Sequence, residues 1–242
     1  MFRKKWILTT LLVILGAALC IRLGIWQLDR LDQRRTFNAH YLSMLELPPL
    51  DLNADTTSDL TAMEYRSVTV RGTYDFDNQV ALLNYYNEGV YGYHLFTPLL
   101  LADGRAVLVD RGWIPAEGND SPSGWMRYEE AAPVQVQGVM RLGVTNVPFG
   151  GRADPPLAEG QTRLDFWNFA NLERIGRQIP YPILPVYIQP TVDLTDAVPP
   201  IPSASTVEIT EGPHMGYAIQ WFFFASLLLV GYPFFLRKQE QA

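Results

Sequence analysis

Residues 217–236 read YAIQWFFFASLLLVGYPFFL, a run of 20 residues without a charged side chain. A helix of about 20 apolar residues is long enough to cross the hydrocarbon core of a bilayer. A second uncharged run, WILTTLLVILGAALCI, covers residues 6–21, and the apolar pattern resumes after Arg22. We therefore predict two transmembrane helices, one over 6–26 and one over 215–236.

The first apolar run follows a basic segment, Arg3-Lys4-Lys5, so a cleaved signal peptide is the alternative to a membrane anchor. Leu19 stands before Cys20, where lipoprotein processing calls for a small residue, and no A-x-A cleavage site follows. We therefore expect a retained anchor. Arg22 near its outer end is tolerated because a long side chain can reach the headgroups.

The charges at the two ends predict the orientation. All three lysines lie in the end segments 1–5 and 237–242, and basic flanks stay on the cytoplasmic side. We predict that both segments are cytoplasmic tails and that residues 27–214 form one extracytoplasmic domain. Three arginines soon after the first span oppose this orientation, but long loops translocate largely regardless of charge. No Ser/Arg-rich presequence precedes the span, so we expect a bacterial inner or plasma membrane.

The predicted domain is acidic. Segment 27–214 carries 13 arginines, no lysine and 24 carboxylates, which leaves a net charge of −11. Such a surface disfavours nucleic acid as a partner. Cys20 is the only cysteine, so an intrachain disulfide is excluded and a hydrophobic core must hold the domain together.

The hydrophobic period changes to two in the middle of the chain. Residues 65–74 alternate apolar and polar side chains, which predicts a strand. The same reasoning predicts further strands, with an Ala102-Asp103-Gly104 hairpin turn, at 80–86, 93–101, 105–111 and 134–141. Strands joined by short turns favour an antiparallel sheet that is closed or folded over one or two helices. The predicted fold class is a membrane protein in which two transmembrane α-helices flank one extracytoplasmic α+β domain, mainly antiparallel β.

Other segments complete this picture. Residues 27–46 are predicted to continue the first helix out of the membrane until two prolines stop it. Apolar residues three apart predict a helix over 165–178. Residues 186–188 form a short strand flanked by prolines, which predicts an edge position. Residues 190–213 are rich in Pro, Thr and Ser and predict an extended strap back to the membrane.

Common catalytic and metal-binding motifs are missing from the sequence. It contains no G-x-S-x-G, G-x-G-x-x-G, P-loop, H-E-x-x-H or C-x-x-C pattern. The three histidines, His40, His94 and His214, are too scattered to indicate a metal site, and His94 in an alternating strand is expected to be structural. We therefore expect a protein that is not an enzyme, with a membrane-anchored enzyme as the least favoured alternative.

Four segments stand out together: LGIWQLDRL at 23–31, GYHLFTPL at 92–99, VDRGWIP at 109–115 and HMGYAIQW at 214–221. In this order, with a span at each end, they closely resemble the surfeit locus protein 1 family, and the resemblance runs the whole length of the chain. It implies an assembly factor for haem–copper oxidases, chiefly cytochrome c oxidase, that assists the insertion or stabilisation of haem a in the catalytic subunit. The implied partners are that subunit, the membrane lipid and, as a further candidate, haem A synthase.

The resemblance also implies a ligand residue. Bacterial members of the family are thought to bind haem a through a histidine at the second span, and the matching position here is His214. The family often has Asn close to this histidine, where this chain has Gly212-Pro213. Pro213 suits the first position of a helix, which places His214 in the first turn, at the outer membrane interface. Imidazole is an ordinary axial ligand of haem iron.

Side chains near His214 are candidates to hold the same cofactor. Tyr217 and Trp221 follow it at i+3 and i+7 and share its helical face. On the first span Arg22, Trp26 and Arg30 recur every fourth residue at a similar depth. We hypothesise that these three face His214, with the tryptophans against the porphyrin and an arginine near the propionates. The simpler alternative is that the arginines are interfacial anchors and the aromatics an interfacial belt.

The VDRGWIP segment allows two interpretations. Arg111, Gly112 and Trp113 are expected to fix the end of a strand, with Gly for an unusual backbone angle and the following proline to end the ladder. They are also candidates for a partner-binding surface. The two functions therefore left open are an assembly factor that handles haem a and a cofactor-free membrane-anchored clamp that stabilises an oxidase assembly intermediate.

Overall fold

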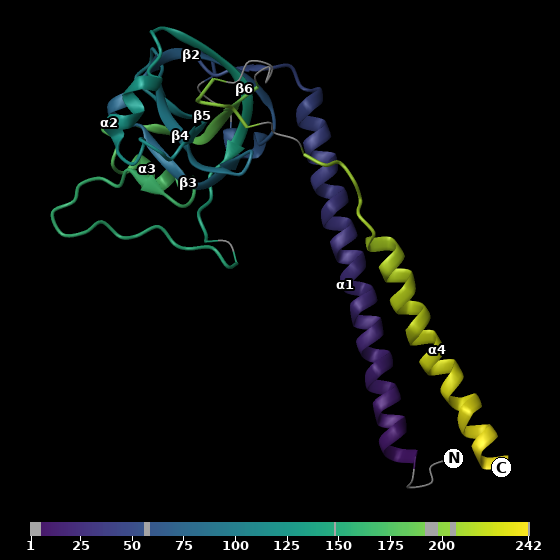
Figure 1. The fold of residues 1–242 in the computed structure, drawn as a ribbon. Coiled ribbons are helices and arrows are strands. Elements are labelled where there is room, and N and C mark those ends of the chain that lie inside the picture. Colours follow the sequence, from purple (N-terminus) through teal and green to yellow (C-terminus); the bar gives the residue numbers. More distant parts are fainter. Residues whose placement is uncertain (1–5, 56–58, 148, 192–197, 204–206, 242) are drawn as a thin grey trace. The chain divides into compact units, whose positions relative to one another are not determined.

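The computed structural model describes residues 6–55, 59–147, 149–191, 198–203 and 207–241. They divide into two units, which are described separately (Figure 1). The helical unit comprises the chain up to Leu42 together with the chain from Val207 onward. The β unit covers Ser43–Thr206.

The helical unit is built from two long helices, α1 (Ile7–Glu46) and α4 (His214–Gln241). Both are long and apolar enough to cross a membrane, which confirms the prediction of one such helix at each end. Helix α1 continues beyond its apolar run and ends just before two prolines, as predicted, because proline removes a backbone donor and clashes with the preceding turn.

In the part of the β unit that the structure describes, there are eight strands and five short helices. The strands are β1 (Leu50–Asp51), β2 (Ser67–Tyr74), β3 (Val80–Asn87), β4 (Val90–Leu100), β5 (Ala106–Pro115), β6 (Val134–Leu142), β7 (Phe166–Trp167) and β8 (Ile183–Pro190). The helices are η2 (Leu60–Met63), η3 (Phe76–Asn78), α2 (Pro122–Trp125), η4 (Met126–Tyr128) and α3 (Leu172–Gly176).

The strands form one sheet that closes on itself. Its order is β1-β2-β6-β8-β5-β4-β3-β7, and the end of β2 also pairs with the end of β4. The closing contacts pair Thr73 with Leu100 and Tyr74 with Leu99. Strands β2, β6, β8, β5 and β4 thereby form a barrel, which confirms the mainly antiparallel β domain. Closure leaves those strands without a free edge.

The barrel interior and one outer face hold separate cores. Val70, Val109 and Ile188 lie in the interior, where apolar side chains from all five barrel strands meet. Outside, α3 packs Leu172 and Ile175 against the β3–β5 surface. The long β4–β5 hairpin takes part in both cores, so it fixes the position of every residue in the VDRGWIP segment.

Two predictions about individual elements were wrong. The helix expected over 165–178 is shorter, because Phe166-Trp167 pairs with β3 and the Asn171 side chain caps a helix that begins only at Leu172. The strand expected at an edge lies between β6 and β5. Its prolines are tolerated there because Pro185 falls at a register shift of the β5 ladder and Pro190 is the last residue of the strand.

Candidate functional site

Small side chains bring α1 and α4 together along a seam of seven-residue spacing. On α1 the buried positions are Ala17, Gly24 and Leu31, and on α4 they are Ala218 and Ala225. A Cβ at Gly24 would lie 2.8 Å from the Phe222 ring, so only glycine allows this approach. Close packing over small residues is how apolar helices associate in lipid, where hydrophobic burial gives no driving force.

His214, the first residue of α4, meets α1 at the end of this seam. Its Nδ1 lies 2.8 Å from the side-chain oxygen of Gln27. Because an amide oxygen accepts, Nδ1 is the donor in this contact, and in the neutral ring Nε2 then presents a lone pair. Tyr217 N–H donates to the Pro213 carbonyl and closes the first helical turn. These contacts orient the imidazole, and in the neutral ring they favour the tautomer with the proton on Nδ1.

Gly212 borders the same imidazole. Its φ is +66°, and a Cβ at this position would lie 3.3 Å from Cδ2 and 3.5 Å from Nε2 of His214. The missing side chain of Gly212 thus leaves space next to Nε2 of His214. A side chain here would also be strained, because a positive φ favours glycine.

The chain leading into α4 is tied to α1 by polar contacts. Arg34 donates to the carbonyls of Glu208 and Thr210, and Asn38 also donates to the Thr210 carbonyl. Arg35 forms a two-point ion pair with Glu211. These contacts fix the approach to His214. Arg34 and Arg35, which opposed the predicted orientation by their charge, have local partners here.

Among the described residues, the aromatic and cation–ring contacts of the other predicted cofactor residues lie within their own helix. Arg22, Trp26 and Arg30 are exposed, and the Arg30 guanidinium lies 5.6 Å from the centre of the Trp26 ring. Tyr217 is exposed, and Trp221 is half-buried in edge contact with Phe224.

The residue of α1 that forms a hydrogen bond with His214 is Gln27, and not Arg22, Trp26 or Arg30. Sequence reasoning did not single out Gln27. The signal that could have found it is spacing. Gln27 follows the buried Gly24 by three residues, which places it beside the seam.

This arrangement fits the axial ligation of a haem iron. A neutral imidazole whose Nδ1 is hydrogen-bonded and whose Nε2 has a lone pair is the form that binds iron. Exposed aromatic and cationic side chains within a few helical turns would suit a porphyrin face and its propionates. Within the residues that the structure describes, no cluster of three or more His, Cys, Asp or Glu offers a site for a bare metal ion.

The VDRGWIP segment lies in the β unit and is mostly buried. The Arg111 guanidinium donates to the Tyr128 carbonyl, to Glu130 and to Gln79, and it lies over the Tyr74 ring. Its side chain is only 2% exposed. These contacts show a strand-fixing role for Arg111, and its use as a partner-binding residue remains a prediction.

Gly112 and Trp113 hold the returning strap. Gly112 has a φ of +115°, and a Cβ there would lie 2.3 Å from the carbonyl oxygen of Ile201. The Trp113 and Ile201 backbones exchange hydrogen bonds of 2.7 and 2.8 Å. The glycine is therefore required by the close approach of the strap. The described strap residues around Ile201 pack on the barrel, whereas those from Val207 onward belong to the helical unit.

His94 forms a second tie to the strap. Its Nδ1 lies 2.8 Å from Asp110, its Nε2 lies 3.1 Å from the Ser203 hydroxyl, and its ring stacks on Tyr85. Serine, histidine and aspartate occur here in the order of a hydrolase triad, but the His94 residue is 2% exposed and enclosed by its partners. Burial, followed by the Asp110 charge, raises the pKa of Tyr85 to about 12. The cluster thus acts as a buried polar tie, in agreement with the expectation that His94 is structural.

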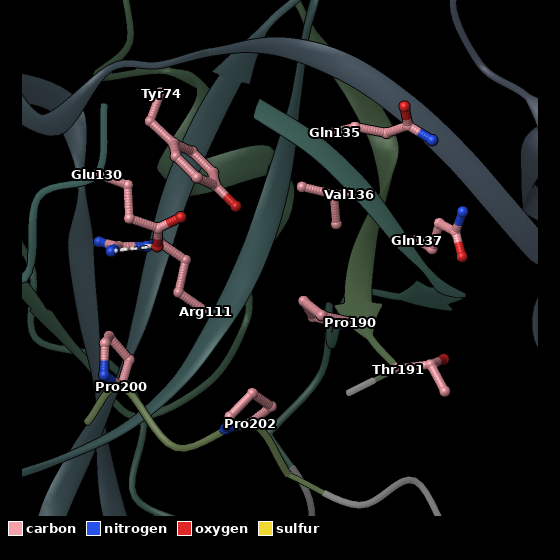
Figure 2. Close-up of a pocket in the computed structure, with 10 residues that line it drawn as sticks. All are labelled: Tyr74, Arg111, Glu130, Gln135, Val136, Gln137, Pro190, Thr191, Pro200 and Pro202. Carbon is pink, nitrogen blue, oxygen red and sulfur yellow. Dashed lines mark hydrogen bonds and ion pairs between the residues drawn. The ribbon is translucent and has the colours of Figure 1, made fainter. Parts of the chain in front are cut away.

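A polar cavity of about 410 Å³ opens beside Arg111 (Figure 2). We call it the Arg111 cavity. It is lined by Tyr74, Arg111, Glu130, Gln135, Val136, Gln137, Pro190, Thr191, Pro200 and Pro202. Figure 2 shows the Arg111–Glu130 pair and the Tyr74 ring on one side and Pro200 and Pro202 below them. Sequence reasoning could not find this cavity, because its lining comes from four separate parts of the chain.

Comparison with known proteins identifies relatives that match about 90% of this chain. Surfeit locus protein 1 of Arabidopsis thaliana is 23% identical over 274 residues, which cover 90% of this chain and 74% of that protein. The protein of the same name from Takifugu rubripes is 24% identical and covers 90% of both chains. A SURF1-like protein of Monosiga brevicollis is 26% identical, covering 89% of this chain and 83% of its own length.

The family model of the SURF1 family matches residues 14–226, which include most of α1, the whole β unit and the first part of α4. The resemblance inferred from four short segments is thereby confirmed over most of the chain. The chain belongs to the SURF1 family.

Proposed function

We propose that this protein is a membrane-anchored assembly factor for a haem–copper cytochrome c oxidase, and that it holds haem a for insertion into, or stabilisation in, the catalytic subunit. The oxidase role is supported by membership in the SURF1 family. We place the protein in a bacterial inner or plasma membrane, with both termini cytoplasmic and the β unit outside, on the distribution of lysines at the chain ends.

The orientation of His214 carries the haem part of this proposal. Its Nδ1 proton is directed to Gln27, which leaves Nε2 as the ligating atom, and Gly212 keeps the space beside Nε2 open. When bound, haem supplies an iron whose axial position an imidazole can fill. Gln27 would act on the ligand itself, since a hydrogen bond to the second ring nitrogen orients a ligating histidine and raises its basicity.

The remaining residues of the site would position the macrocycle. Trp26, Tyr217 and Trp221 would offer ring faces, and Arg22 or Arg30 would pair with propionates. Coordination and positioning are sufficient for this role, so no step requires the protein to make or break a covalent bond. Haem A synthase is the proposed supplier, and the catalytic subunit is the proposed acceptor.

Optical spectroscopy tests this proposal. The full-length protein is purified in detergent after co-expression with the haem A pathway, alongside His214→Ala and Gln27→Leu. We expect a reduced α-band characteristic of haem a in the parent, its loss in His214→Ala and a lower haem occupancy in Gln27→Leu. His40→Ala is the matched control, because it removes another histidine of the helical unit and should leave the band unchanged.

A colourless parent under haem-replete conditions would contradict the haem assignment. The cofactor-free clamp would then account for the protein, and the β unit would hold the partner-binding surface. Under the clamp hypothesis His214→Ala leaves oxidase assembly intact, whereas substitutions around Trp113 abolish capture of the assembly intermediate.

A further inference from the structure

The Arg111 cavity contains a guanidinium whose ion pair with Glu130 uses only one of the two carboxylate oxygens. Nε and Nη2 of Arg111 lie 3.2 and 2.7 Å from the same oxygen, Oε1, of Glu130. Nε and Nη2 form one edge of the guanidinium. In a bidentate pair this edge donates two parallel hydrogen bonds, one to each oxygen of a carboxylate. Within the described residues, the second oxygen of Glu130 accepts no hydrogen bond. The pairing seen here is thus a partial version of the full two-point interaction.

The two partners differ in how firmly they are held. The Arg111 side chain is 2% exposed, with its other contacts to Tyr128, Gln79 and two aromatic rings, whereas the Glu130 side chain is 51% exposed. Glu130 lies outside helices and strands, between η4 and β6. A buried guanidinium requires an anion. A half-exposed glutamate in an irregular segment can nevertheless move into water at small cost if another carboxylate takes its place.

A second donor stands next to this pair. The Tyr74 hydroxyl lines the cavity and has no hydrogen-bond partner among the described residues. Burial raises the pKa of Tyr74, and the Glu130 charge raises it further, so the hydroxyl stays protonated and can donate. An incoming carboxylate would therefore find two guanidinium donors and a phenol donor within one cavity.

The remaining lining indicates what carries the carboxylate. The volume of about 410 Å³ is within the range of ligand pockets and more than ten times the ~30 Å³ share of a liquid water molecule. Arg111 is the only cation in the lining, which matches one negative charge rather than a phosphate group. Gln135, Gln137 and Thr191 add amide and hydroxyl groups of the kind that pair with peptide groups, and three prolines supply flat apolar walls.

We propose that the Arg111 cavity binds an acidic side chain presented on an extended peptide segment of a partner protein, and that Glu130 occupies the Arg111 edge until that carboxylate replaces it. The exchange trades one carboxylate for another, so the buried cation is never left unpaired. This proposal concerns the β unit alone and does not depend on haem binding at His214.

Isothermal titration of the full-length protein in detergent at low ionic strength tests the exchange. The probes are the tripeptide N-acetyl-Ala-Glu-Ala-amide, its neutral counterpart with Gln in place of Glu, and sodium acetate. We expect the acidic tripeptide to bind, and Glu130→Gln to tighten its binding about two- to fivefold, since a half-exposed ion pair competes by no more than that. Glu129→Gln makes the same charge change one residue earlier and should leave binding unchanged.

Arg111→Gln should abolish binding of the acidic tripeptide. Because this residue also fixes the strand end, Tyr74→Phe provides a second variant, which keeps the ring under the guanidinium and should weaken binding severalfold. Equal tightening by Glu129→Gln, or equal binding of the neutral tripeptide, would overturn the proposal. Acetate binding as tightly as the acidic tripeptide would overturn the peptide assignment in favour of a free carboxylate.

Discussion

The helical unit and the β unit place their apolar side chains in opposite ways. Leu227 of α4 is 59% exposed, whereas Leu99 of the barrel is fully enclosed. In the helical unit most buried positions are small, Leu31 being the large exception, and many large apolar residues face outward. The comparison teaches that hydrophobic burial holds the barrel, whereas close contact over glycine and alanine holds the helix pair, as expected when lipid is the solvent.

The two units also differ in where their paired polar side chains lie. In the helical unit, paired side chains lie toward the ends of the seam, where Thr10 meets Tyr232 and Gln27 meets His214. In the β unit they are enclosed, as in the contacts of His94 and Arg111. His214 of the helical unit thus remains available to a ligand, whereas His94 of the β unit serves as an internal tie.

The largest effect is expected for a matched pair of leucine substitutions. Leu99→Ala removes a fully enclosed side chain and should destabilise the protein by about 2–5 kcal/mol, whereas Leu227→Ala removes an exposed one and should cost little. Thermal unfolding of both variants in the same detergent measures the difference. Equal losses would break the comparison, because they would mean that α4 is held by burial of its large apolar side chains.

The seam of the helical unit is tested by adding volume to it. Gly24→Val should force the helices apart, because even a Cβ would lie 2.8 Å from the Phe222 ring, and overpacking of this kind costs about 1–3 kcal/mol. The readout is cross-linking of cysteines placed at Thr10 and Tyr232 in a Cys20→Ala background. Gly231→Val is the control, since a Cβ there has nothing within 4 Å. Unchanged cross-linking in Gly24→Val would contradict the proposed seam.

Acid should lower the stability of the β unit by protonating Asp75. Its carboxylate accepts from the Tyr181 hydroxyl at 2.6 Å and from Asn78. Burial raises the pKa of Asp75, but these hydrogen bonds lower it more, and the net pKa is below its ordinary value. The stability that it contributes is therefore complete above the unfolded pKa of about 3.9 and is lost as the pH falls through the lower folded pKa.

We therefore expect Asp75→Asn to cost about 1–2 kcal/mol at pH 7, as for the loss of hydrogen bonds to a charged group. The variant should also lose less stability than the parent between pH 4 and pH 2, because it lacks this titration. Unfolding temperatures measured across that range provide the check. Parallel curves for parent and variant would show that Asp75 is not the acid-sensitive group.

The smallest effect is expected at the Arg35–Glu211 pair. Both side chains are about half exposed, so water and salt screen their attraction even though the geometry is two-point. Glu211→Gln should leave the unfolding temperature unchanged within error at 0.15 M salt. A clear drop would show that this pair holds the chain that leads into His214.

The sequence by itself determined the elements that depend on local pattern. The two apolar ends, the continuation of α1 to the proline pair, and the β4–β5 hairpin around Asp103-Gly104 were predictable. Uncharged runs of bilayer length, helix-breaking prolines and a period of two each act over a few neighbouring residues. The four family segments were also readable, and with them the SURF1 family.

Only the tertiary structure decided which distant residues meet. Barrel closure pairs the ends of β2 and β4, and it places β8 at the centre of the sheet despite its prolines. Gln27 and His214 are 187 residues apart, so their hydrogen bond depends on how the two helices pack. The Arg111 cavity likewise draws its lining from four parts of the chain. Local patterns indicate which face of an element is apolar, but the partner of each face depends on the packing of the whole chain.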